Sequence, residues 1–151
     1  MSVYEKLREL NIEVPAPTPA MATFVPAVRT GNLLFVSGHI ATKDGKPWTG
    51  RLGAGIATPE GQQAARAVAI DLLSTLNAAL GDLNKIRRIV KLLVLVASTP
   101  EFAEQHLVAN GASQLFAAVF ADRGSHARSA IGIVGTPLGA CVEIELIAEV
   151  D

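Results

Sequence analysis

Residues Leu92 to Val96 are five consecutive apolar side chains, and this run constrains the fold more than any other feature of the sequence. Side chains along a strand alternate between its two faces. A strand that is apolar on both faces belongs inside a sheet that is covered on both sides. We therefore expect Ile86 to Val96 to form an interior strand.

Two helices are predicted, one before and one after this strand. Gln62 to Leu80 carries apolar residues at spacings of three and four, and Gly81 follows as a stop signal. Thr58-Pro59-Glu60 predicts the start of this helix, with Thr58 as the N-cap. Ser98-Thr99-Pro100-Glu101 repeats that start signal before the second helix, Phe102 to Phe120.

Four further segments have the composition of strands: residues 23–29, 33–40, 127–134 and 140–150. The first two are predicted to form a hairpin around Thr30-Gly31-Asn32, and the last two to flank a turn at residues 135–139. The order ββαβαββ predicts an α+β fold, with one mixed sheet and two helices on one of its faces.

The first twenty residues are predicted to form an N-terminal arm, followed by a single domain over residues 21–151. Val3 to Leu10 has a short helical pattern, and Pro15, Pro17 and Pro19 then impose an extended segment. We expect this arm to be ordered only where it lies on another surface.

The chain is rich in apolar residues, since 50% of its 151 residues are hydrophobic and only 18% are charged. Glycine and proline interrupt its uncharged stretches, so no membrane span is expected. Helices on one face of the sheet leave the other face uncovered, and assembly into a closed trimeric barrel would bury it.

Charge and cysteine content exclude several classes of function. A net charge of −1 and a pI of about 6.3 disfavour nucleic-acid binding, which usually requires a basic patch. One cysteine and three scattered histidines predict neither an internal disulfide nor a metal site. The N-terminus lacks an apolar signal segment, so we expect a cytoplasmic protein.

The last strand carries glutamates on the face predicted to point away from the helices. Glu143 and Glu145 alternate there with core residues, and buried carboxylates need partners. The alternative is an edge strand with solvated glutamates. Arg128, on the preceding strand, is predicted to lie roughly opposite these glutamates and to bind a substrate carboxylate through two N–H groups. The alternative for Arg128 is a structural Arg–Glu ion pair.

Other candidate residues favour structural roles. Ser37 and His39 are predicted to share a strand face, but no nucleophile-elbow motif surrounds the serine. His106 is expected on a helix surface, and Cys141 is expected to be a small buried residue. His126 precedes Arg128 and could border a site.

Three groups of residues together resemble the RidA (YjgF) family of small trimeric proteins, over residues 22–150. They are Phe24-Val25 with the segment from Gly31 to Ile40, then Ala127-Arg128-Ser129, then the strand from Val142 to Ala148. The N-terminal arm is similar to that of the chorismate-mutase-like subfamily, also labelled endoribonuclease L-PSP. The resemblance implies a chorismate-mutase-like fold, a homotrimer and active sites between subunits.

The resemblance also implies roles for individual residues. Arg128 matches the arginine that binds the substrate carboxylate, and Glu143 matches the glutamate that activates water. Gly38 matches a backbone contact at the site, and Asn110 a polar residue on the second helix. Three positions depart from the family pattern, with Phe24 in place of a tyrosine, Ala130 in place of a cysteine and His39 in place of a glutamine.

We therefore expect a cofactor-independent hydrolase that converts reactive 2-imino or enamine acids to 2-keto acids and ammonia. A chorismate-mutase-like reaction is the alternative within the same fold. A non-catalytic trimer that binds small metabolites, or acts as a chaperone, is the alternative from another class. An endoribonuclease is least favoured, because the sequence has no basic face and no paired histidines.

Overall fold

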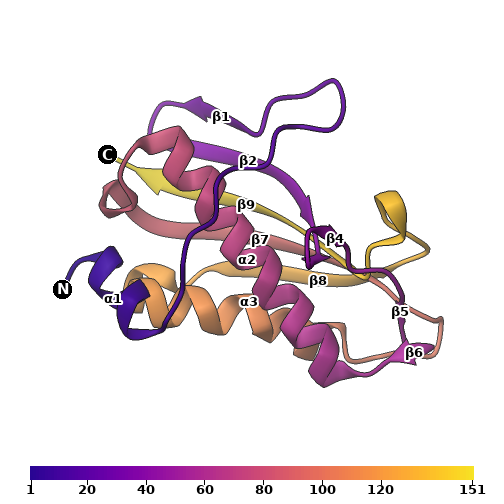
Figure 1. Cartoon of the computed structure of the whole chain (residues 1–151). Coiled ribbons are helices and arrows are strands. Elements are labelled where there is room, and N and C mark those ends of the chain that lie inside the picture. The colour runs from indigo at the N-terminus through magenta and orange to yellow at the C-terminus, as the bar shows by residue number, and fades with distance from the viewer.

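The computed structural model describes residues 1–151 and consists of a five-stranded sheet with two long helices packed against it (Figure 1). The principal elements are α1 (Val3–Glu9), β1 (Ala27–Thr30), β2 (Leu33–Ile40), α2 (Thr58–Leu80), β7 (Ile86–Ala97), α3 (Gln105–Phe120), β8 (Ala127–Ile133) and β9 (Val142–Val150). The loop before α2 contains the short strands β3 (Thr42–Lys43), β4 (Lys46–Pro47), β5 (Arg51–Leu52) and β6 (Gly55–Ile56). Three 3-10 turns complete the chain: η1 (Leu83–Lys85), η2 (Ala121–Gly124) and η3 (Pro137–Gly139).

The strand order of the sheet is β1-β2-β9-β7-β8, which confirms the predicted α+β class with one mixed sheet. Strand β7 is interior, as its apolar run predicted, and pairs in parallel with β8 through the crossover helix α3. Strand β9 lies between β2 and β7, antiparallel to both. The last two strands are therefore not neighbours, and β9 is not an edge strand.

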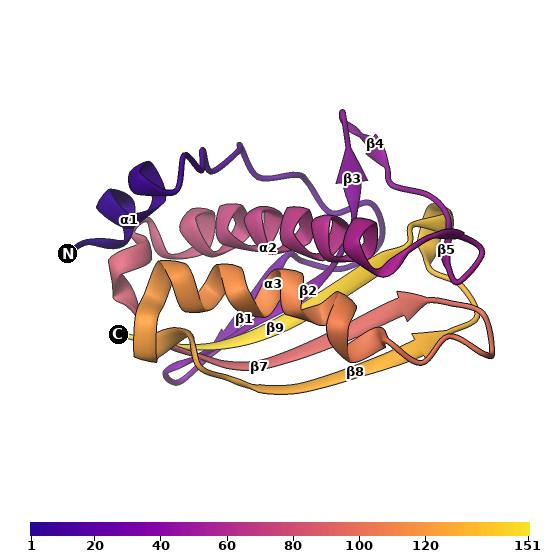
Figure 2. The same cartoon turned by 90° about the horizontal axis from the view of Figure 1, so that it is seen from below.

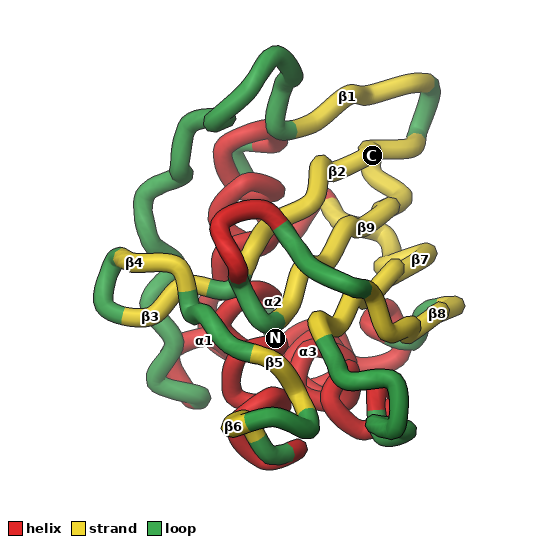
Figure 3. The backbone as a smooth tube through the Cα atoms, turned by 90° about the vertical axis from the view of Figure 1, so that its right-hand side faces the viewer, coloured by secondary structure: helices red, strands yellow, loops and turns green.

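Both long helices cover the same face of the sheet, as Figures 2 and 3 show from two directions. The side chains of β9 that face them are fully or almost fully buried, as predicted: Val142, Ile144, Leu146 and Ala148. The opposite face, which we call the open face, receives no helix of this chain. It includes the exposed apolar side chains of Leu33, Phe35 and Ile131.

The two helices approach each other closely at Gly111. A Cβ at this position would overlap the backbone carbonyl of Gln62 on α2, so only glycine fits. The predicted helix starts differ from the observed ones by a few residues. Ala57, not Thr58, is the N-cap of α2, and the Thr58 hydroxyl instead donates to the carboxylate of Glu104 at 2.6 Å.

The N-terminal arm lies on the helices of its own chain. Val3 and Leu7 of α1 are buried in the same hydrophobic core as the sheet and the long helices. Farther along, the buried Ser74 hydroxyl of α2 donates to the carbonyl of Pro15 at 2.6 Å. The surface that orders the arm is thus supplied by α2 and its neighbours. No helix of the chain has both the length and the apolar character needed to cross a membrane.

Candidate functional site

Arg128 projects from the edge strand β8 toward α3. Its Cα partner on β7 is Leu92, which is fully buried beneath the helices, so both side chains are on the helix-covered face. The Arg128 Nη1 donates to Asn110 Oδ1 at 2.9 Å and to Ser113 Oγ at 3.0 Å. Its Nη2 donates to the carbonyl of His106 at 3.0 Å. Helix α3 therefore fixes the guanidinium from one side.

The outer part of the Arg128 guanidinium has no acceptor within the chain. A guanidinium carries five N–H donors, and the three hydrogen bonds to α3 leave the Nε–H and one Nη2–H unused. No buried side-chain nitrogen or oxygen lacks a partner, so the unpartnered Nε of Arg128 is accessible. The chain's ion pairs are Lys6–Glu9 and Arg87–Asp151, so the alternative of an Arg128–Glu pair within the chain is wrong.

Four residues complete the surroundings of Arg128, and we call these five residues the arginine group: Asn110, Ser113, His126, Arg128 and Ala130. Asn110, for which the resemblance implied only a polar site residue on the second helix, accepts a hydrogen bond from Arg128. Ala130 is two residues farther along β8 and packs against the hydrophobic core. His126 was predicted to border a site, whereas Ser113 was not predicted. Helical spacing could have found it, because Ser113 follows Asn110 by three residues on α3.

His126 is linked to Arg128 through Ser113. The Ser113 hydroxyl and His126 Nε2 are 2.9 Å apart, and His126 Nδ1 is 2.6 Å from the carbonyl of Gly124. The edge of one ring meets the face of the other at Phe116 and His126, with centroids 6.3 Å apart. The imidazole is therefore held in one orientation beside the arginine group.

Glu143 is on the open face of the sheet. Its neighbours along β9, Val142 and Ile144, are fully buried on the helix-covered face, and its Cα partners are Ile40 and Leu95. Burial raises the pKa of Glu143 above its ordinary value, and the nearby Glu145 carboxylate adds to this effect, whereas His39 opposes it. Glu143 thus has the environment of a group that can take up and return a proton.

A bulge in β2 brings Gly38 against this carboxylate. The register shifts between Val36 and His39, and a Cβ at Gly38 would overlap the Glu143 Oε1. The bulge also corrects a prediction, because Ser37 and His39 do not share a face. His39 pairs with the buried Ile144 and contacts the Thr75 hydroxyl of α2 at 2.7 Å, while the Ser37 hydroxyl donates to the carbonyl of Val25.

We call Gly38, Glu143 and Glu145 the glutamate group. Within one chain, this group does not lie beside the arginine group. The prediction that Arg128 lies opposite the glutamates is wrong within one chain, because β7 separates β8 from β9 and the side chains point to opposite faces. Phe24 is half exposed in the loop before β1, at the far edge of the sheet from β8. Of the six predicted site residues, Asn110, Arg128 and Ala130 therefore lie in the arginine group, Gly38 and Glu143 lie in the glutamate group, and Phe24 lies in neither.

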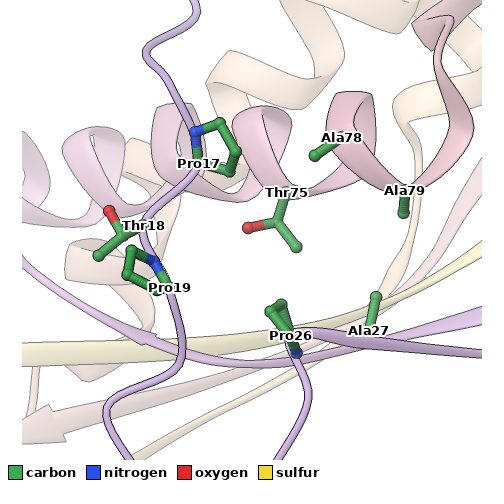
Figure 4. Close-up of a pocket in the computed structure, with 8 residues that line it drawn as sticks. All are labelled: Pro17, Thr18, Pro19, Pro26, Ala27, Thr75, Ala78 and Ala79. Carbon is green, nitrogen blue, oxygen red and sulfur yellow. The ribbon is translucent and has the colours of Figure 1, made fainter.

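The other site-like features lie outside these two groups. A hollow of about 470 Å³ lies between the proline-rich arm, the start of β1 and α2 (Figure 4). Its walls are mainly proline rings and small side chains, with no charged residue: Pro17, Thr18, Pro19, Pro26, Ala27, Thr75, Ala78 and Ala79. No cluster of His, Cys, Asp or Glu has the makeup of a metal site. Cys141 is buried, and burial raises its thiol pKa to about 11.

Comparison with known proteins assigns the family. The family model for endoribonuclease L-PSP matches residues 15–150, nearly the whole chain. The chain belongs to the endoribonuclease L-PSP (RidA/YjgF) family. Protein TCP17 of Trypanosoma cruzi is 44% identical over 151 residues, with 99% of this chain and 94% of that protein covered.

Solved structures of L-PSP relatives have the same fold. The protein Atu1372 of Agrobacterium tumefaciens is 45% identical with a TM-score of 0.91, covering 99% of this chain and 92% of that one. RidA from the Antarctic bacterium Psychrobacter is 25% identical with a TM-score of 0.60, covering 89% of this chain and 94% of that one. The chain is thus more similar to Atu1372 than to that RidA, in sequence and in fold.

Proposed function

We propose that this L-PSP protein hydrolyses reactive 2-imino or enamine acids to 2-keto acids and ammonia. The observation that carries the proposal is Arg128, whose guanidinium is fixed by α3 and keeps two N–H groups free. Two such donors match the two oxygens of a carboxylate. Family membership supports the same chemistry. A 2-imino acid presents both a carboxylate, which Arg128 can bind, and an electrophilic C=N carbon, which water can attack.

The active site is proposed to form between subunits of a homotrimer. The arginine group and the glutamate group point to opposite sides of one sheet, so one small substrate cannot touch both within a chain. The open face carries exposed apolar side chains, which favours association with further copies. A trimer of 15.8 kDa chains has a mass of about 47 kDa, which light scattering can measure.

In the proposed mechanism, Arg128 of one subunit holds the carboxylate while Glu143 of another acts on water. The Glu143 carboxylate accepts a proton as the water oxygen bonds to the C=N carbon, and the imine nitrogen takes a second proton from solvent. Glu143 then returns its proton to the nitrogen as the C–N bond breaks. Loss of the remaining hydroxyl proton to solvent leaves the 2-keto acid and ammonia, so the protons balance. A raised pKa suits Glu143 to both proton transfers.

Ammonia release from freshly generated 2-imino acids tests the reaction, with titration of a stable 2-keto acid as a separate measure of binding. Arg128→Ala is expected to abolish turnover and keto-acid binding while leaving the trimer and Tm nearly intact. Glu143→Gln is expected to keep binding and lose turnover, because an amide cannot take up the proton of water. Unchanged keto-acid affinity in Arg128→Ala would contradict the role of the arginine. Keto-acid binding by a wild-type protein that releases no ammonia would instead indicate a metabolite-binding protein.

A further inference from the structure

Arg128 donates a hydrogen bond to the Ser113 hydroxyl, and His126 sets the orientation of that hydroxyl. The contacts run in one line, from His126 Nε2 to Ser113 Oγ at 2.9 Å and from Ser113 Oγ to Arg128 Nη1 at 3.0 Å. We propose that Ser113 and His126 are positioning residues, which aim the free N–H groups of Arg128 and so set the affinity for the substrate carboxylate. This inference rests on the proposed function of Arg128 and adds two residues to it.

The chemistry of the partners determines the direction of each hydrogen bond. The carbonyl of Gly124 can only accept, so His126 Nδ1 must carry a hydrogen and donate to it. In the neutral imidazole, Nε2 then has no hydrogen and accepts from the Ser113 hydroxyl. The hydroxyl hydrogen points at His126, and a lone pair of Ser113 Oγ is left facing Arg128 Nη1.

The histidine is itself well fixed. Gly124 is buried against α3, where a Cβ would overlap the carbonyl of Phe116, so η2 can approach the helix only with glycine there. That close approach places the Gly124 carbonyl 2.6 Å from His126 Nδ1. The ring of Phe116 lies at 85° to the imidazole and limits its rotation. His126 therefore presents its Nε2 to Ser113 in one direction.

Without this acceptor, Ser113 has a competing partner. A serine inside a helix can turn its hydroxyl back toward the carbonyl four residues earlier, which is that of Ala109. That rotation would move Oγ away from Arg128 and leave Asn110 as the only side chain that holds the guanidinium. His126 prevents the rotation by accepting the hydroxyl hydrogen. A guanidinium held at both Nη positions loses less conformational freedom when it binds a carboxylate.

Three variants test the pair through keto-acid titration and steady-state ammonia release. Ser113→Ala is expected to raise both Kd and KM about tenfold, the usual effect of losing one hydrogen bond to a charged group, with kcat changed less than about twofold. His126→Phe keeps an aromatic ring at this position but removes the acceptor for the Ser113 hydroxyl, so it should also raise KM. His126→Gln is expected to keep KM near the wild-type value, because the glutamine amide oxygen can accept from Ser113 where phenylalanine cannot. The matched control is Gln114→Ala, an exposed neighbour on α3, which should leave both constants unchanged.

The outcomes separate this inference from the proposed function. If Arg128→Ala abolishes keto-acid binding while Ser113→Ala and His126→Phe bind like wild type, the positioning role is wrong and the role of Arg128 stands. If Arg128→Ala itself binds the keto acid normally, the proposed function of Arg128 is wrong and the positioning role is wrong with it. A loss of kcat with unchanged KM, or a His126→Gln variant as impaired as His126→Phe, would also overturn the positioning role. If Ser113→Ala does not fold, the two His126 variants decide the question alone.

Discussion

Arg128 and Glu143 point to opposite faces of one sheet, and strand β7 lies between the strands that carry them. Each has surroundings suited to one half of a hydrolysis, since Arg128 keeps two N–H groups free and Glu143 has a raised pKa. A substrate of a few atoms cannot reach both side chains through the sheet. An active site that uses both therefore requires two copies of the chain.

Mixing two inactive variants tests this requirement directly. Arg128→Ala and Glu143→Gln are each expected to be inactive alone. If every site takes Arg128 from one subunit and Glu143 from another, random reassembly of equal amounts should restore about a quarter of wild-type ammonia release. Each variant unfolded and refolded alone is the control. No recovery in mixtures shown by mass spectrometry to contain both chains would contradict an inter-subunit site.

The raised pKa of Glu143 makes a prediction for stability. Burial, together with Glu145, raises this pKa above the ordinary value of 4.5. The folded chain then keeps a proton that the unfolded chain has already lost, so stability falls as the pH rises from 4.5 through the raised value. Glu143→Gln has no such proton, so it should match wild type near pH 4 and melt at a higher temperature near pH 7.

Thermal melts of both proteins across this pH range measure the effect. A difference in Tm that does not change with pH would show that the carboxylate carries no penalty in the folded protein. The same titration should appear in the activity of wild type, because protonated Glu143 cannot accept a proton from water. Ammonia release by wild type is therefore expected to decline toward acid pH, with a midpoint above 4.5.

Hydrophobic periodicity predicted most of the fold correctly. The alternation along Val142 to Val150 indicated which side chains face the helices, and the two-sided apolar run placed β7 inside the sheet. Both signals depend on residues close together in the chain, where side-chain direction follows from local geometry. The motif Ala127-Arg128-Ser129 likewise indicated Arg128, whose guanidinium has N–H donors without an acceptor in the chain.

Strand pairing and side-chain direction at the site were not predictable in the same way. Strands β8 and β9 follow each other in sequence, but the crossover through α3 places β8 beside β7. The distance between Arg128 and Glu143 therefore depends on long-range topology. The bulge after Val36 reverses the face of His39, and the only sequence signal for it is Gly38 inside the strand. Helical spacing places Ser113 beside Asn110, but it does not show that Arg128 and His126 contact that face of α3, so Ser113 was missed.

The N-terminal arm is expected to contribute to stability as part of the fold. Leu7 is only 3% exposed and lies in the main hydrophobic core, so Leu7→Ala should cost about 2–4 kcal/mol of unfolding free energy. Arg8→Ala, one residue farther along α1 and exposed, is the control and should change stability little. Chemical denaturation measures both. Equal stability of the two variants would mean that α1 is not docked in solution.

Gly38 is expected to be required for turnover and dispensable for carboxylate binding. In Gly38→Ala the added methyl overlaps Glu143 Oε1, and the flexible end of that side chain must move. Small displacements of a reacting group have large kinetic effects, so kcat should fall about 10- to 100-fold. Keto-acid affinity should stay unchanged because Arg128 binds the carboxylate from the other group. Gly135→Ala is the control, since nothing lies within 4 Å of its added Cβ. Wild-type kcat in Gly38→Ala would show that the position of Glu143 beside Gly38 is not the reactive one.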